Sequence, residues 1–191
     1  EEKKKQYEEE KKELATFIGK KSVTKDGVKL KLYANIALAI EIANIVKNDA
    51  EGIGLFRSEY MYINRNDTPS IEEQLNSILE IGKKVSGPIT FRTLDVGADK
   101  YAPTLGNYQA VNPALGLRGI RYAKNYKQLL KDQFEAVLLA SNSVDIRVMI
   151  PMISCTDEFI FAKNVRKRNR LLYDQNKQIR SSVRQQKRLC K

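Results

Sequence analysis

The fold is decided by one stretch of sequence, which reads GIGLFRSEYM (52–61), then SIEEQLNSILEIGKK (70–84), then PITFRTLD (88–95). The first and third segments are short, apolar and strand-like, whereas the second has helical periodicity with its isoleucines and leucines on one side. Ser70 stands three residues before Glu73, which is the spacing of a capping box at the start of a helix. The stretch therefore predicts a βαβ unit with parallel strands.

The same alternation of strands and helices extends on both sides. The further expected elements are a strand in VKLKLYANIA (28–37), a helix over 36–47, an amphipathic helix in YKQLLKDQFEAVLLA (126–140), a strand in VDIRVMI (144–150) and a helix beginning at 152. Four strands and about four helices predict an α/β fold, either half of a (β/α)8 barrel or a small open, doubly wound sheet. No GxGxxG motif follows the first strand, which argues against a dinucleotide site.

The net charge of +11 is concentrated at the end of the chain. Ten of the 34 lysines and arginines, but only one of the 23 acidic residues, lie in 164–191, so the preceding part is nearly neutral. A nucleic-acid partner would have to use this tail, which has one aromatic residue, Tyr173, and no recognisable binding module. Nucleic acid is therefore not the expected partner.

Composition predicts a soluble, cytoplasmic protein with no membrane partner. The longest apolar stretch, 32–46, is interrupted by Asn35 and Glu41 and is too short to span a bilayer. The first residues have no basic segment followed by an apolar one, so a secretory signal is not expected. Cys155 and Cys190 are isolated, which fits a reducing compartment.

Three arginines stand where an anion could bind. Arg57 lies near the end of the second expected strand, Arg92 within the third, and Arg118 in NPALGLRGIR (112–121). An arginine in an apolar strand is costly to bury unless it is paired or faces a ligand, and its guanidinium group matches phosphate and carboxylate. At the C-terminal end of barrel strands the ligand is favoured.

The alternative interpretation of these arginines is a set of structural ion pairs. It would join Arg57 to Glu59 or Asp95, and Arg92 to Asp95 or Asp99. The pattern leaves both interpretations open.

Other residues could extend the site. The segment TLDVGADK (93–100) could line a ligand or form an ordinary loop. Asn35 could donate a hydrogen bond to the same site or cap a turn, and Arg121 is similarly ambiguous. For Arg147 a structural ion pair is favoured. The sequence has no histidine, so these residues can build neither a phosphohistidine nor a histidine-based metal site.

Four segments together resemble one enzyme family. They are AEGIGLFRSEYMYINRNDTPSIEEQ (50–74), FRTLDVGADK (91–100), NPALGLRGIR (112–121) and IRVMIPMIS (146–154). In order and spacing they are similar to the phosphoenolpyruvate-binding barrel of phosphoenolpyruvate–protein phosphotransferase, enzyme I of the bacterial sugar phosphotransferase system. The resemblance extends over residues 1 to about 165. It implies a truncated TIM (β/α)8 barrel of about four βα units.

The resemblance also implies three parts of the chain. These are a charged linker helix (1–24), the first half of the barrel domain (25–165) and a basic tail (166–191) that is either out of frame or disordered. Where the family has a fifth, apolar strand with a metal-binding glutamate, the tail stays basic and polar. We therefore expect a disrupted reading frame near 165–180.

The resemblance implies a function as well. Arg57, Arg92 and Arg118 correspond to arginines that bind phosphoenolpyruvate in the family. The full-length enzyme transfers the phosphoryl group to a protein histidine, uses Mg²⁺, acts on the histidine-containing phosphocarrier protein and forms a homodimer. Its magnesium ligands, catalytic cysteine and phosphorylated histidine have no counterpart here, so no catalytic or metal-binding residue is assigned and the chain alone is expected to be inactive.

Two alternatives remain beside this function. Pyruvate phosphate dikinase and phosphoenolpyruvate synthase share the G-[IV]-G-L-x-R-[ST]-E core, so the chain could be a fragment of either. The third class is a basic nucleic-acid-binding protein that uses the tail.

Overall fold

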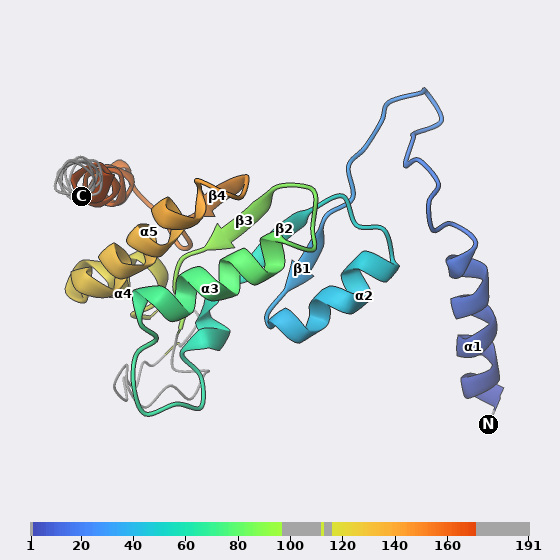
Figure 1. The fold of residues 1–191 in the computed structure, drawn as a ribbon, viewed down its shortest axis with the longest axis horizontal. Coiled ribbons are helices and arrows are strands. Elements are labelled where there is room, and N and C mark those ends of the chain that lie inside the picture. The colour runs from blue at the N-terminus through green and yellow to red at the C-terminus, as the bar shows by residue number, and fades with distance from the viewer. Residues whose placement is uncertain (1, 97–111, 113–115, 171–191) are drawn as a thin grey trace, which may run out of the picture.

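The computed structural model describes residues 2–96, 112 and 116–170. The helices are α1 (Glu2–Ala15), α2 (Ile42–Lys47), α3 (Ile71–Gly82), α4 (Gly119–Asn125), α5 (Lys127–Ala140) and one over 156–170, with short 3-10 helices η1 (Ala39–Glu41) and η2 (Ser58–Met61). The strands are β1 (Ala34–Ile36), β2 (Ile53–Arg57), β3 (Ile89–Arg92) and β4 (Ile146–Met149). Figure 1 shows their arrangement.

The four strands form one parallel sheet in the order β1-β2-β3-β4. Each connection between neighbouring strands carries helix: α2 in the first, α3 in the second, and α4 with α5 in the third. A doubly wound sheet reverses its strand order at a switch point, whereas barrel strands follow one another sequentially. The sequential order confirms the predicted α/β fold and is consistent with part of a (β/α)8 barrel.

Helix α3 begins where the sequence predicts. The Ser70 hydroxyl accepts a hydrogen bond from the Glu73 amide at 3.1 Å, and the Glu73 carboxylate accepts one from the Ser70 amide at 2.6 Å. The predicted capping box is thus confirmed. It satisfies two amide groups that the helix itself leaves without partners.

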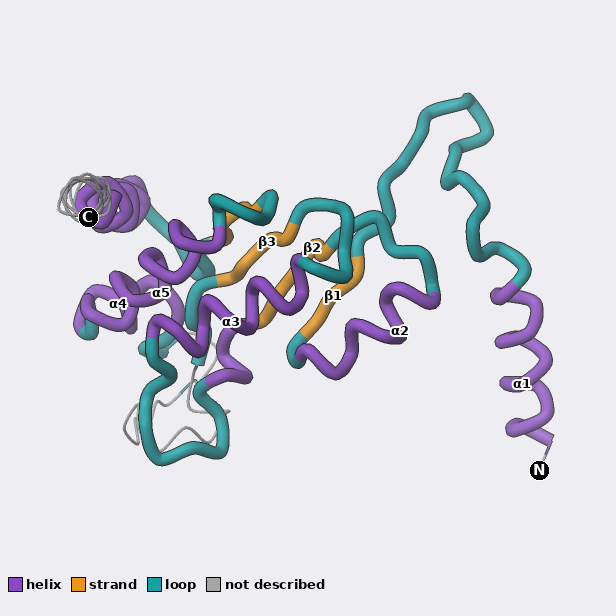
Figure 2. Tube along the Cα trace, in the orientation of Figure 1, coloured by secondary structure: helices purple, strands orange, loops and turns teal. Residues whose placement is uncertain are grey.

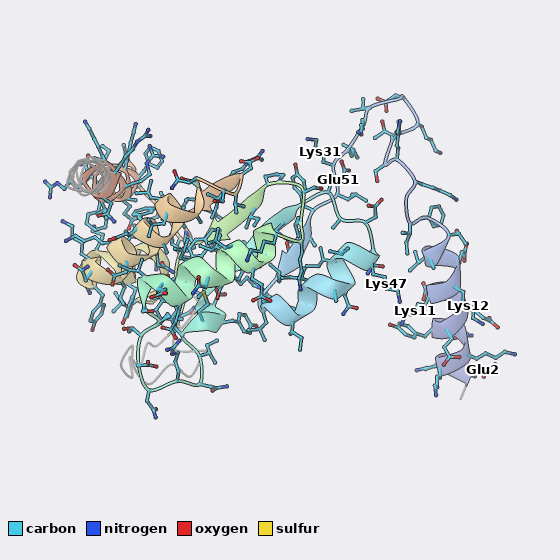
Figure 3. All side chains as sticks on the ribbon, in the orientation of Figure 1. Glu2, Lys11, Lys12, Lys31, Lys47 and Glu51 are labelled. Carbon is cyan, nitrogen blue, oxygen red and sulfur yellow. The ribbon has the colours of Figure 1, made fainter. Side chains whose placement is uncertain are left out.

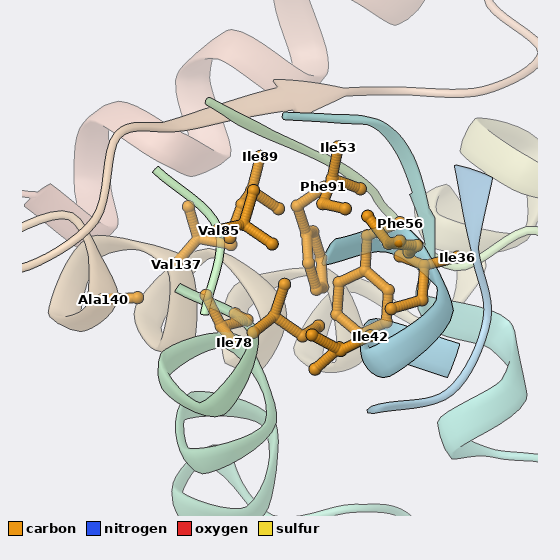
Figure 4. Packing of buried hydrophobic residues seen from close by; sticks show 12 residues of the cluster. Ile36, Ile42, Ile53, Phe56, Ile78, Val85, Ile89, Phe91, Val137 and Ala140 are labelled. Carbon is orange, nitrogen blue, oxygen red and sulfur yellow. The ribbon is translucent and has the colours of Figure 1, made fainter. Parts of the chain in front are cut away.

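The main hydrophobic core lies between the helices and one face of the sheet (Figure 4). Phe56 and Phe91 are register partners on β2 and β3, and their rings meet edge to face with centroids 5.5 Å apart. Val148 of β4 is the register partner of Phe91 and packs against both this cluster and a second one beneath 156–170. Helices therefore cover this face along the sheet.

The opposite face of the sheet is lined differently. Alternation along the strands places Leu55, Arg57, Arg92 and Met149 there, because neighbours in sequence point to opposite sides. None of the hydrophobic clusters among the described residues includes Leu55 or Met149. In a closed barrel this face is the interior. At the ends of β2 and β3 this face therefore carries the two arginines, Arg57 and Arg92.

The first strand is shorter than the alternating pattern of 28–37 predicts. Pairing with β2 starts only at Ala34, whereas Val28, Leu30 and Leu32 are half exposed. A local turn holds this segment instead, through an antiparallel bridge between Val23 and Lys29. The alternation of apolar residues with lysines thus belongs to an exposed loop.

Helix α1 stands apart from the sheet and buries none of its residues (Figures 1 and 2). Figure 3 shows Glu2, Lys11 and Lys12 projecting from it. The mixed charges along α1 fit an exposed, solvated helix. No helix within the described residues is both long enough and apolar enough to cross a membrane. The basic tail beyond residue 170 lies outside the described residues.

Candidate functional site

Arg57 and Arg92 lie side by side at one end of the sheet. Each is the last residue of its strand, β2 and β3 respectively, and the two are register partners. Partners on adjacent parallel strands are about 4.8 Å apart and point to the same face. The fold thus brings two guanidinium-bearing residues to the C-terminal edge of the sheet, on the face opposite the main hydrophobic core.

Two buried carboxylates, Glu59 and Asp95, form ion pairs with Arg92 and Arg118. Arg92 pairs with the fully buried Glu59 through Nη2, and its Nη1 lies 3.6 Å from Asp95. Asp95 also receives Arg118, whose Nε and Nη2 donate to its two oxygens at 2.9 and 3.1 Å. This bidentate contact fixes the plane of the Arg118 guanidinium. Glu59, Arg92, Asp95 and Arg118 therefore form one alternating chain of charges.

Arg57 has a different environment. Its guanidinium carbon lies 5.0 Å from the centroid of the Tyr60 ring. Its Nε is buried and has no hydrogen-bond partner among the described residues, and the same holds for the Nε of Arg92. Buried donors without partners are rare in folded proteins and call for an explanation. A bound acceptor would provide one.

The charge of Arg57 contributes to a lowered pKa of Glu41, which lies in η1. The pKa of Glu41 is lowered, first by hydrogen bonds from the amides of Leu38 and Ala37 and then by the charge of Arg57. The carboxylate is thus held by the backbone of its own turn. It remains ionised on the β1 side of the arginine pair.

The expected structural ion pairs occur only in part. Arg92 does contact Asp95, and Glu59 pairs with Arg92 rather than with Arg57. Asp99, like the rest of 97–100, lies outside the described residues. The two interpretations are therefore compatible: Arg92 and Arg118 are held by carboxylates, and Arg57 is the arginine that neither proposed partner engages.

The other expected residues lie around the edge of this cluster. Asn35 is the register partner of Leu55, two positions before Arg57 along β2, and is exposed. Arg121 donates to the carbonyl of Gly116 at 2.9 Å. Arg147 is exposed on β4, two residues before the end of that strand. None of the three belongs to the charge chain described above.

Sequence reasoning did not identify Gln133. This residue of α5 is only 1% exposed, and its side chain hydrogen-bonds to the backbone of Leu94 and to the hydroxyl of Ser58. Its signal in the sequence is a glutamine among leucines and a phenylalanine on the buried side of a helix. A polar side chain at such a buried position needs a hydrogen-bond partner, because burial without one is costly.

Among the described residues, no group of three or more His, Cys, Asp or Glu side chains could hold a metal ion. The two carboxylates nearest the arginines, Glu59 and Asp95, are already engaged by guanidinium groups. A divalent cation needs several oxygen ligands that are not neutralised in this way. The described part of the chain therefore does not build a magnesium site.

Comparison with known proteins identifies the family of the chain. The family model of the PEP-utilising enzyme, PEP-binding domain, matches residues 11–185. The chain is 37% identical over 161 residues to the phosphoenolpyruvate-protein phosphotransferase of Priestia megaterium, covering 84% of this chain and 28% of that protein. It is 41% identical over 150 residues to the enzyme of the same name from Borreliella burgdorferi, covering 77% and 26%.

A third relative has the same name and the same extent of match. The phosphoenolpyruvate-protein phosphotransferase of Mycoplasma capricolum is 38% identical over 158 residues, or 83% of this chain and 28% of that protein. The chain thus spans little more than a quarter of the length of these curated relatives. The chain belongs to the PEP-utilising enzymes, matches their PEP-binding domain, and has phosphoenolpyruvate-protein phosphotransferases as its curated relatives.

Proposed function

We propose that Arg57, Arg92 and Arg118 bind phosphoenolpyruvate, in a protein that passes its phosphoryl group to a protein histidine. The observation that carries this proposal is the pair of buried Nε donors on Arg57 and Arg92, which are register partners at one edge of the sheet. Guanidinium groups suit a substrate that carries both a phosphate and a carboxylate. The names of the curated relatives support this substrate.

The charges of the cluster fit an anion. Glu59 and Asp95 hold Arg92 and Arg118 in ion pairs. Arg57 pairs with neither carboxylate in the structure, and its charge acts on Glu41 at a distance, so the Arg57 guanidinium is available to an anionic ligand. Phosphoryl transfer depends mainly on positioning and on stabilising charge, which arginines held in place can supply.

The described residues provide only part of such an enzyme. They lack a metal site, and the chain covers about a quarter of each relative. We therefore propose that Mg²⁺ binding, the contact with a histidine-containing phosphocarrier protein and the homodimer interface depend on regions outside this chain. It follows that the chain alone binds the substrate weakly and transfers nothing. We also propose that the intact enzyme works in the cytoplasm.

Calorimetric titration with phosphoenolpyruvate in the presence of Mg²⁺ tests the proposal. Wild type should bind, and Arg57→Ala should weaken binding at least tenfold, since a charge-assisted contact contributes about 1.5–3 kcal/mol. Arg166→Ala is the matched control, because Arg166 is exposed on 156–170 and its loss changes the net charge equally. Equal binding by both variants, or none by wild type, would refute the assignment.

A further inference from the structure

We propose that Gln133 is a positioning residue. From helix α5 it fixes the spacing of Arg57 and Arg92 through hydrogen bonds to the residues that follow them. The inference rests on the anion site proposed above but concerns a residue that does not touch the ligand. Gln133 lies on α5, and its Nε2 donates to the Ser58 hydroxyl at 3.0 Å. Its Oε1 accepts from the Leu94 amide at 2.9 Å.

The two partners of Gln133 follow the two arginines directly. Ser58 is the residue after Arg57, and Leu94 is the second residue after Arg92. The register between β2 and β3 ends at the arginines themselves. One side chain therefore joins the two chain segments just past the last paired residues. Without it, the strand ladder and the Glu59–Arg92 ion pair would remain as ties between β2 and β3 at this edge.

The geometry of this link restricts both segments at once. Gln133 uses one donor and one acceptor of a planar amide, so a shift of either segment would lengthen a hydrogen bond that water cannot replace. Ser58 has no exposed surface and Gln133 is 1% exposed. A buried polar group left without its partner is costly. The amide thus resists relative movement of the residues that carry the guanidinium groups.

A buried glutamine can also be a purely structural residue, and the chain contains one for comparison. Gln74 on α3 has no exposed surface, and its Nε2 donates to the Pro69 carbonyl at 3.1 Å. This contact closes the loop before α3 and lies on neither strand end. Gln74→Met therefore removes a buried amide, as Gln133→Met does, without touching the segments after the arginines.

The test compares Gln133→Met with Gln74→Met in the full chain. Phosphoenolpyruvate affinity is measured by calorimetry with Mg²⁺, and the side-chain Nε–H signals of Arg57 and Arg92 are recorded by ¹H–¹⁵N NMR without ligand. We expect Gln133→Met to weaken binding about tenfold and to shift both arginine signals. We expect Gln74→Met to change affinity by less than about twofold, with the arginine signals unmoved.

Ser58→Ala provides a milder variant should Gln133→Met fail to fold. It cuts the link at its other end, and we expect it to shift the Arg57 signal and weaken binding. In the double variant Ser58→Ala/Gln133→Met, affinity should equal that of Gln133→Met alone, because the same link is already lost.

Each outcome decides the inference. Gln133 would act through stability alone in either of two cases. The losses of phosphoenolpyruvate affinity could multiply in the double variant, or Gln133→Met and Gln74→Met could lose affinity equally. If wild type binds no phosphoenolpyruvate, the proposed function fails, and the arginine signals still decide whether Gln133 positions the pair.

Discussion

Glu59 is fully buried and forms an ion pair with Arg92. Glu59 lies in η2, directly after β2, whereas Arg92 is the last residue of β3. The pair therefore joins two strands through charge as well as through the backbone. A carboxylate without exposed surface is stable only where a cation compensates it. The arginine edge of the sheet is thus part of the folded core, and its loss should be visible in stability.

Glu59→Ala should destabilise the chain by about 3 kcal/mol, because it leaves the largely buried Arg92 without its main counter-charge. Urea unfolding followed by circular dichroism measures this loss. The double variant Glu59→Ala/Arg92→Met, which removes both charges, should recover part of it. Should the double variant prove less stable than Glu59→Ala, the pairing would not be the source of the effect.

Arg57→Met, unlike Glu59→Ala, should not destabilise the chain. The Arg57 Nε is buried without a partner among the described residues, so a methionine should leave stability unchanged or raise it by about 1 kcal/mol. The same variant should lose phosphoenolpyruvate binding. Arg92→Met is the comparison, and we expect it to lower stability because Glu59 would then be buried unpaired. The unfolding midpoint of Arg92→Met should therefore lie below that of wild type, and the midpoint of Arg57→Met at or above it.

Strong local signals explain how much of the fold the sequence could predict. The Ser70 capping box, the apolar run of β2 and the four strands all appear as expected, since each depends on neighbouring residues. The strand expected over 28–37 forms only at Ala34–Ile36, because alternation alone cannot show whether one face will be buried. Its lysines and its exposed leucines, Leu30 and Leu32, lie in a loop.

The site was predictable to a similar extent. The sequence singled out the three arginines and offered Asp95 as a partner of Arg92, which the structure confirms. It did not predict the contacts of Arg92 with Glu59 and of Arg118 with Asp95, which span 33 and 23 residues. Gln133 escaped notice for the same reason. Its partner Ser58 is 75 residues away. Long-range partners follow from the register of the sheet, which no local pattern specifies.

Gly119→Ala should destabilise the chain and displace Arg118. Gly119 has φ +54°, and a Cβ there would lie 2.8 Å from the Pro151 carbonyl oxygen. We expect a loss of about 2 kcal/mol or more, because steric conflict adds to the left-handed backbone. Gly27→Ala is the control, since Gly27 has φ +89° with no atom within 4 Å. A loss no larger than that of the control in thermal unfolding would argue against the close approach.

The start of α3 should respond to pH through Glu73. The pKa of Glu73 is lowered from 4.5, first by the hydrogen bond from the Ser70 amide and then by Arg65, which also contacts Asp67. A carboxylate with a lowered pKa stabilises the folded state fully above its unfolded pKa, and this contribution is lost as pH falls through the folded value.

Glu73→Gln separates this contribution from other acids in the chain. Glutamine retains an oxygen that can accept from Ser70, but it does not titrate and cannot pair with Arg65. At pH 7 wild type should be the more stable, by the modest amount expected of an exposed carboxylate. Below pH 4.5 the stability difference should begin to shrink, and the two unfolding curves should converge once the pH has fallen through the lowered pKa of folded Glu73, where the protonated side chain resembles the amide. A stability difference that stays constant from pH 7 to pH 3 would mean that the Glu73 charge contributes nothing to the cap.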